Sequence, residues 1–287
     1  MPPMISTLAR ALCVALASSL VSATALAQPL EIVPRDLYTE RMRQEGNKLV
    51  FCINPEGVLA QFERDLAETI GQSLLADIAF YEVGERDWPT RPLPFDYRIV
   101  LTEQQMYIML MQECDGFMGF LLSASNPSWM SITAPYIRAR TVLVTRDGTQ
   151  GLQEVPQGEA IGVRMMASGD NRLIQFLAAQ PEGRGWRRTP YPDNALMLER
   201  LSDGTIGAGM IWEYGLFGAT AGDPAGEGYT YSYELPFPVE PIEIGIATRT
   251  EDTYLNGMLS DAIAALAADG TIDDLLRRNG LTDINGD

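Results

Sequence analysis

Polar and aromatic side chains directly follow several short apolar runs of the sequence, the places where strands of an α/β protein end and ligands bind. Trp212 and Glu213 follow one such run. An indole can stack on a planar ligand, and a carboxylate can accept hydrogen bonds or hold a cation. A core tryptophan beside a solvated glutamate explains the same pair equally well. Both residues are therefore candidates for binding, and neither is paired with a catalytic partner.

Other candidates follow other apolar runs. Asn54 and Glu56 lie in the loop after residues 48–53, although turn chemistry explains Asn-Pro and Glu-Gly at least as well. Ser123 and Asn126 offer neutral donors, or a turn, after a glycine. Ser168 lies where a helix N-terminus would attract an anion, and it also suits an ordinary cap. The candidate cleft residues are Asn54, Glu56, Phe120, Ser123, Asn126, Ser168, Trp212 and Glu213.

The composition excludes much of enzymology and several partners. Histidine is absent, which excludes Ser-His-Asp and Cys-His catalysis and metal sites that need imidazole. No calcium loop is recognisable, and methionines at helical spacing indicate core packing. We expect no catalytic residue, metal or cofactor. With 21 Lys and Arg against 38 Asp and Glu, the net charge is −17, so neither nucleic acid nor an anionic membrane is an expected partner.

The first residues indicate export. An apolar run over residues 11–21 ends in Ala25-Leu26-Ala27, which is typical of a signal peptide, and an anchoring helix is the alternative. We therefore expect a periplasmic protein that is not inserted in the membrane after cleavage of residues 1–27. Two cysteines remain in the mature chain, Cys52 and Cys114. An even pair in an exported protein predicts a disulfide, with a pair of buried thiols as the alternative.

The rest of the chain alternates between strand and helix patterns. Residues 48–53 form a continuous apolar run, and Phe62, Leu66 and Ile70 then recur at helical spacing, with Glu63 off that stripe. The predicted strands are 48–53, 78–83, 114–119, 141–145, 160–164, 207–212 and 240–248, and the predicted helices are 58–74, 104–112, 171–179, 194–201, 253–268 and 272–279. Residues 181–192 read as a loop.

This order predicts an α/β protein with two lobes, each a parallel or mixed sheet flanked by helices. Two crossing strands, near 140–145 and 237–244, would form a hinge between them. We expect a first lobe over 28–140, a second lobe over 141–240, and a return to the first lobe with the C-terminal helices over 241–287.

Three motifs resemble the two-lobed periplasmic solute-binding proteins of the amino-acid type (family 3, type II fold). They are Cys114-Asp-x-x-x-Gly119, Ser131-Ile-Thr-Ala-Pro-Tyr136, and the ending from Ala268-Asp-Gly to Asn279-Gly-Leu281. The resemblance implies an amino-acid clamp, but the clamp positions differ in this chain. The arginine for a ligand carboxylate falls on Asn126, the Gly-Thr pair on Met166-Ala167, and the acid for a ligand ammonium on Trp212.

A narrower branch, MoxJ/MxaJ/XoxJ, is similar at Cys52, Cys114-Asp115, Ile211-Trp212 and Leu235-Pro-Phe237. The branch usually has Trp-Gly-Pro where this chain has Trp212-Glu213-Tyr214. Its resemblance implies a non-catalytic periplasmic accessory that supports a PQQ-dependent methanol or alcohol dehydrogenase. The alternative is the substrate-binding component of an ABC transporter, with an ABC permease as partner and a small polar solute as ligand. The sequence identifies neither the ligand nor the partner.

Overall fold

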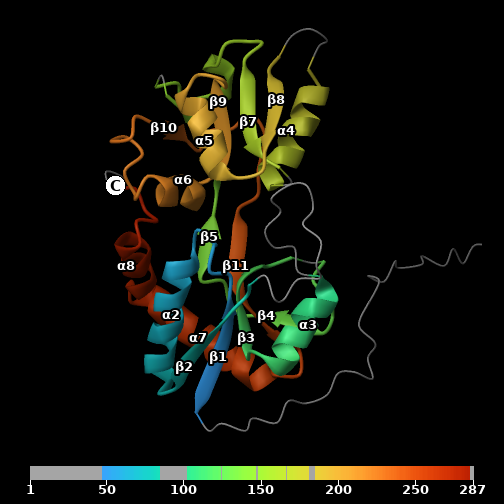
Figure 1. Cartoon of the computed structure of the whole chain (residues 1–287), viewed down its shortest axis with the longest axis vertical. Helices are drawn as coiled ribbons and strands as arrows, with labels where there is room; N and C mark the ends of the chain where they lie inside the picture. Colours follow the sequence, from blue (N-terminus) through green and yellow to red (C-terminus); the bar gives the residue numbers. More distant parts are fainter. Residues whose placement is uncertain are drawn as a thin grey trace, which may run out of the picture. The chain divides into compact units, whose positions relative to one another are not determined.

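A computed structural model of the chain describes residues 47–84, 102–123, 125–146, 148–165, 167–180 and 185–284, and it contains two mixed β-sheets flanked by helices (Figure 1). The expected signal peptide lies outside the described residues. Within the described ranges, no helix combines the length and the apolar character needed to cross a membrane.

The first sheet has the strand order β2-β1-β3-β11-β4, and β5 also pairs with β11. β1 is parallel to β2 and β3, whereas β11 is antiparallel to β3, β4 and β5. The strands are β1 (Lys48–Ile53), β2 (Asp77–Glu82), β3 (Gly116–Leu121), β4 (Met130–Ile132), β5 (Ile137–Ala139) and β11 (Ile242–Arg249). The helices beside this sheet are α2 (Ala60–Leu74), α3 (Glu103–Gln112), α7 (Thr253–Ala268) and α8 (Thr271–Arg278).

β1 shows why this sheet is covered on both faces. Leu49 and Phe51 pack in the core with α2, α7 and α8, whereas Val50 and Cys52 face the core beside α3. Side chains alternate between the faces of a strand, so a continuous apolar run needs a helical layer on each side. Figure 1 shows α2 and α3 on opposite sides of the sheet. The prediction of a doubly buried strand at 48–53 is confirmed.

The glycine expected to end the third strand lies inside it. β3 continues to Leu121, and Gly119 has a φ of +83°. Phe117 pairs with Ala247 and Phe120 with Gly245, so β3 holds one extra residue between these pairs. Glycine at positive φ is the usual residue of such a bulge, which explains why it does not terminate the strand.

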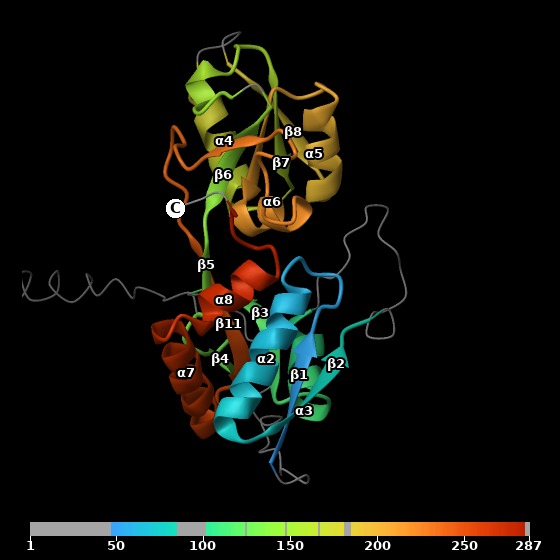
Figure 2. The same cartoon turned by 90° about the vertical axis from the view of Figure 1, so that its left-hand side faces the viewer.

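The second sheet has the order β10-β6-β9-β7-β8, with β7 parallel to β8 and β9. Its strands are β6 (Thr141–Thr145), β7 (Ala160–Arg164), β8 (Arg187–Tyr191), β9 (Ala208–Trp212) and β10 (Thr230–Ser232). The helices beside it are α4 (Ser168–Ala178), α5 (Asn194–Ser202) and α6 (Glu213–Ala219). A short 3-10 turn lies at Leu152–Glu154. In β6, Val142 and Val144 face the α5 side, and Leu143 faces the α4 side. Figure 2 shows α4 and α5 on opposite sides of this sheet.

The sequence prediction lacks β8, β10 and α6, and it starts α4 later than the structure does. The segment read as a loop contains β8, an edge strand that carries Pro190. Proline is tolerated at a sheet edge, where a backbone donor is not needed, but it disguises the strand in the sequence. The helix α6 begins directly after β9 without a connecting turn, so its seven residues give no separate signal. The helix α4 begins at Ser168, three residues before the predicted start at Asn171.

The chain passes between the sheets twice. One passage runs from β5 through Arg140 into β6, and the other runs from β10 through residues 233–241 into β11. β5 and β11 pair antiparallel, with Ile137 opposite Ile244 and Ala139 opposite Ile242. The two passages are therefore neighbours at the edge of the first sheet, as the predicted crossings required.

Candidate functional site

A pocket lies where parallel strands of both sheets end. Its lining includes four of the eight candidate residues: Asn54 and Glu56 after β1, Phe120 at the end of β3, and Trp212 at the end of β9. The lining also includes residues that were not among the predicted candidates, such as Glu63, Met118, Arg164, Asp193 and Asn194. The carboxyl ends of parallel strands meet at one edge of a sheet, so residues distant in sequence converge there.

Asn54 has its side-chain oxygen and its backbone oxygen committed to its own turn. Its Oδ1 accepts a hydrogen bond from the Glu56 amide at 3.1 Å, and its backbone oxygen accepts one from Gly57 at 3.2 Å. This is the turn chemistry expected of Asn-Pro-Glu-Gly. The turn holds Asn54 and the exposed Glu56 on the wall of the pocket.

Ser123 and Asn126 lie around a separate surface depression with Pro127 and Ile132. The Asn126 amide donates to the Leu121 carbonyl at 3.1 Å, and Ser123 Oγ lies 2.8 Å from Ser125 Oγ. These contacts form a local turn. Ser168 is exposed at the start of α4. The first turn of this helix also carries Asp170, whose carboxylate accepts a hydrogen bond from the Arg188 guanidinium at 2.8 Å. The structure therefore does not bring Ser123, Asn126 or Ser168 to the wall formed by Trp212.

Trp212 is held against α5 and α6. Among the described residues, its Nε1 and the Oδ1 of Asn194 are buried without a hydrogen-bond partner. Both side chains crowd Gly215, because a Cβ there would lie 2.5 Å from Asn194 Nδ2 and 2.6 Å from Trp212 Nε1. Gly215 is thus the residue whose small size lets the indole and the amide pack together.

We expect Gly215→Ala to displace Trp212 and to destabilise the protein by about 1–3 kcal/mol, the usual cost of overpacking. The measurement is urea unfolding monitored by tryptophan fluorescence. The emission maximum of the folded variant should be shifted from that of the wild type. Gly257→Ala is the matched control, because Gly257 lies inside α7 and a Cβ there meets nothing within 4 Å. That control should be neutral or stabilising, since alanine favours helix. Equal effects of both variants would contradict the packing argument.

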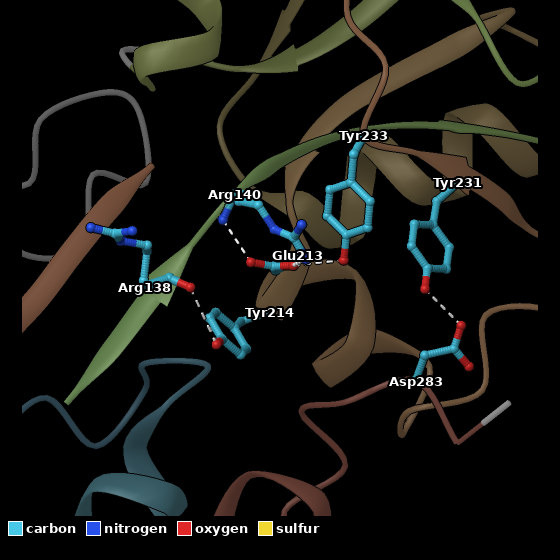
Figure 3. Close-up of polar contacts among 7 residues, drawn as sticks. All are labelled: Arg138, Arg140, Glu213, Tyr214, Tyr231, Tyr233 and Asp283. Carbon is cyan, nitrogen blue, oxygen red and sulfur yellow. Dashed lines mark hydrogen bonds and ion pairs between the residues drawn. The ribbon is translucent and has the colours of Figure 1, made fainter. Parts of the chain in front are cut away.

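Glu213, the remaining candidate, faces the chain passages between the sheets (Figure 3). It is 5% exposed, and its carboxylate accepts hydrogen bonds from the Arg140 backbone amide at 2.7 Å, the Arg140 guanidinium at 3.2 Å and the Tyr233 hydroxyl at 2.7 Å. The guanidinium also lies 3.6 Å from the centre of the Tyr233 ring. Arg140 belongs to one passage and Tyr233 to the other. The carboxylate therefore ties both passages to the first turn of α6, immediately after Trp212.

Neighbouring tyrosines extend this cluster. The Tyr231 hydroxyl donates to Asp283 at 2.7 Å, which holds the C-terminal segment against β10 (Figure 3). Burial, followed by the hydrogen bond to Glu213, raises the pKa of Tyr233 above its usual range, and burial raises the pKa of Tyr231 to about 12. Both phenols therefore remain neutral hydrogen-bond donors at physiological pH. The sequence interpretation of Glu213 as a ligand contact differs from this geometry, because its carboxylate is occupied by the passages.

A second buried carboxyl, Glu63, lies on the pocket wall and is 4% exposed. The prediction that Glu63 lies off the buried stripe of α2 is wrong. The buried side of the helix includes Leu66, Ala67 and Ile70, which are three, four and seven positions after Glu63 and share its face. The Tyr136 hydroxyl donates to Glu63 Oε1 at 2.6 Å and itself accepts from the Gly119 amide at 2.8 Å. Burial raises the pKa of Glu63 to about 7, although the Tyr136 hydrogen bond opposes the rise.

Comparison with known proteins bears on the fold. Neither a protein-family model nor a curated protein sequence matches the chain. Solved structures do match. The ancestral cationic amino acid solute-binding protein AncCDT-1 is 15% identical, with 82% of this chain and 96% of that chain covered and a TM-score of 0.61. Substrate-binding domain 2 of GlnP from Lactococcus lactis is 16% identical, with 84% and 97% covered and a TM-score of 0.58.

The L-cystine solute receptor of Neisseria gonorrhoeae is also similar, at 16% identity, 84% and 95% coverage and a TM-score of 0.57. The chain has the two-lobed fold of periplasmic binding proteins. Nearly the whole of each of these structures is covered, so both sheets and both passages belong to the shared fold. At this level of identity, the similarity describes the fold and does not transfer a ligand.

The pocket lining carries one indole, two phenyl rings, two side-chain amides, three carboxyls and one guanidinium. These groups belong to Trp212, Phe117, Phe120, Asn54, Asn194, Glu56, Glu63, Asp193 and Arg164. Within the described ranges, no group of three or more histidine, cysteine or acidic side chains is arranged to hold a metal ion. Glu63 and Asn194 are among the lining residues that were not predicted. The spacing of Glu63 relative to Leu66 and Ile70 was a usable signal for the first, and Asn194 gave none.

Proposed function

We propose that the protein is a non-catalytic solute-binding protein that holds a small polar solute in the pocket between Trp212 and the β1 and β3 ends. The observation that carries this proposal is the convergence of Asn54, Glu56, Phe120 and Trp212, from both sheets, on one pocket. Aromatic walls with a few polar groups are typical of small-molecule sites. The similar solved structures include solute receptors and substrate-binding domains, which supports the same class of function.

The solute we propose is not a conventional amino acid. The position expected to carry a carboxylate-binding arginine is Asn126, and its amide is engaged by the Leu121 carbonyl beside a different depression. Trp212 occupies the position expected for an ammonium-binding acid. Loss of both charged partners removes the interactions that recognise a zwitterion. A solute with a different set of polar groups fits this wall better.

We further propose that the protein works in the periplasm and delivers its solute to an ABC permease. The signal-peptide pattern of residues 1–27 supports export. Similar solved structures include the substrate-binding protein of an amino acid ABC transporter, which supports a transport partner. The dehydrogenase accessory role, implied by resemblance to the MoxJ branch, stays a prediction.

The decisive experiment is native mass spectrometry of protein purified without unfolding, joined to growth of a deletion strain. A co-purified small molecule, and a strain that loses uptake of that solute, would support the proposal. Loss of growth on methanol together with loss of dehydrogenase activity, while uptake is normal, would replace it with the accessory role.

Trp212 should dominate ligand affinity. Trp212→Ala is expected to weaken binding of the co-purified solute about 30-fold, because a central aromatic contact contributes about 2 kcal/mol. The measurement is isothermal titration calorimetry on the folded variant. Trp212→Phe, which keeps an aromatic face, should recover part of the affinity. Unchanged affinity in both variants would show that the solute does not contact this ring.

A further inference from the structure

The Glu63 carboxyl has one oxygen bound internally and the other left for the pocket. Oε1 accepts from the Tyr136 hydroxyl at 2.6 Å, and within the described residues Tyr136 is its sole hydrogen-bond partner. The Tyr136 oxygen is itself fixed by the Gly119 amide at 2.8 Å. The phenol proton is thereby committed to Glu63. A carboxyl that is 4% exposed and lines a pocket normally needs more partners than one.

Gly119 keeps this carboxyl reachable. A Cβ on Gly119 would lie 3.2 Å from Glu63 Oε1 and 3.7 Å from Oε2, so any side chain there would cover the carboxyl group. Gly119 also lines the pocket. The bulge that places a glycine at this point of β3 therefore leaves an opening between the pocket and Glu63.

The other pocket groups favour a cation. The lining carries the acids Glu56, Glu63 and Asp193 against one base, Arg164, so its formal charge is negative. Phe120 and Trp212 supply aromatic faces, which attract ammonium groups through their ring quadrupoles. A carboxylate beside aromatic rings is a chemically suitable site for an organic ammonium ion.

We propose that Glu63 is the specificity-determining carboxylate of the pocket and that it binds the ammonium group of an organic amine or quaternary ammonium solute. This inference rests on the solute-binding function proposed above and names its ligand class. For a primary amine, an N–H of the ammonium donates to Oε2 while Tyr136 continues to donate to Oε1. A quaternary ammonium makes the same charge contact without a hydrogen bond.

Binding should then depend on pH. Burial raises the pKa of Glu63 to about 7, so the carboxyl is protonated below neutrality and a cation must displace that proton. The titratable group packed against Glu63 is Tyr136, whose pKa burial raises well above its usual value, and Gly119 presents backbone alone. The charged groups elsewhere on the wall are Glu56, Arg164 and Asp193. Affinity should fall about tenfold per pH unit below pH 7 and level off above it.

The test is calorimetric titration of the full mature protein at pH 6 and pH 8 with ethanolamine, choline and putrescine. The neutral probe is myo-inositol, the anionic probe is succinate, and a panel of amino acids completes the set. We expect at least one amine to bind about tenfold more tightly at pH 8 than at pH 6. At pH 6, binding should release a proton, so the observed binding enthalpy should depend on the ionisation enthalpy of the buffer.

Glu63→Gln should abolish this pH dependence and weaken amine binding at pH 8 at least tenfold. Glu68→Gln makes the same chemical change at an exposed site on α2 and should behave as wild type. Proton release in wild type is a readout that needs no variant. Tight binding of an amine by Glu63→Gln, or binding of myo-inositol, succinate or amino acids in place of amines, would overturn the ligand class and leave the solute-binding function standing. Binding of no probe, together with no co-purified molecule, would overturn both.

Discussion

Reduction of the Cys52–Cys114 disulfide is expected to lower the free energy of unfolding by about 4 kcal/mol. The two residues are 62 positions apart. In the chain-entropy model, opening a loop of this length restores a large conformational freedom to the unfolded chain and costs about 4 kcal/mol. Cys52 lies in β1 and Cys114 lies just before β3, and both are fully buried with Tyr107, Leu110 and Trp129. The disulfide thus joins neighbouring strands beneath α3.

The measurement is urea unfolding of the oxidised protein and of the same protein kept reduced. Comparison of one sequence in two redox states avoids the cavity that Cys→Ala variants would leave. A double Cys52→Ala, Cys114→Ala variant should be at least as unstable as the reduced protein, because it also loses packing in that core. A difference in the free energy of unfolding below about 1 kcal/mol between the oxidised and reduced forms would contradict the prediction. It would show that the unfolded chain gains little conformational freedom when the disulfide is broken.

Glu63→Gln is expected to become more stable relative to wild type as pH rises, by about 3 kcal/mol between pH 4.5 and pH 7. The pKa of Glu63 is raised from 4.5 to about 7 in the folded protein, and 2.5 units correspond to about 3 kcal/mol. A raised carboxyl pKa means that the folded state holds its proton longer than the unfolded state. The stability of wild type therefore falls as pH rises through this window and levels off above pH 7.

Glutamine at position 63 can accept the Tyr136 hydrogen bond without acquiring a charge. The Glu63→Gln protein should therefore not lose stability through this group as pH rises. The experiment is urea unfolding of both proteins at pH 5 and pH 8, reported as the difference between them at each pH. Other titrating groups are common to both proteins and cancel in the difference. Glu68→Gln, on the exposed side of the same helix, should show no such trend. A constant difference between wild type and Glu63→Gln across this range would contradict a buried, protonated carboxyl.

These two predictions support the ligand test. A Glu63→Gln protein that is at least as stable as wild type at pH 8 cannot lose amine binding through unfolding. The stability measurement therefore separates a damaged fold from a lost contact. Oxidised protein should be used throughout, because the disulfide lies beside β3, the strand that carries Gly119 and Phe120.

The sequence determined most of the secondary structure and the general plan of the fold. The apolar run at 48–53 required a sheet with two helical layers, and the structure supplies α2 and α3 on its two sides. The helix over Thr253–Ala268 was predicted with its observed bounds. Periodicity is enough for such elements because burial on a face repeats with the geometry of the strand or helix itself. The elements that were not predicted include β8, whose proline is acceptable at an edge, and α6, which is short and follows a strand directly.

The sequence also placed Asn54, Glu56, Phe120 and Trp212 after strands, and parallel strands bring such positions together. What each polar side chain contacts was decided by the tertiary structure. Glu213 meets Arg140, and Glu63 meets Tyr136, each across 73 positions of sequence. Local patterns specify which face of an element is buried, but they carry no information about which distant segment covers that face. The partners of both buried carboxyls, and with them the pKa of Glu63, exist only once the two sheets and their connecting passages have formed.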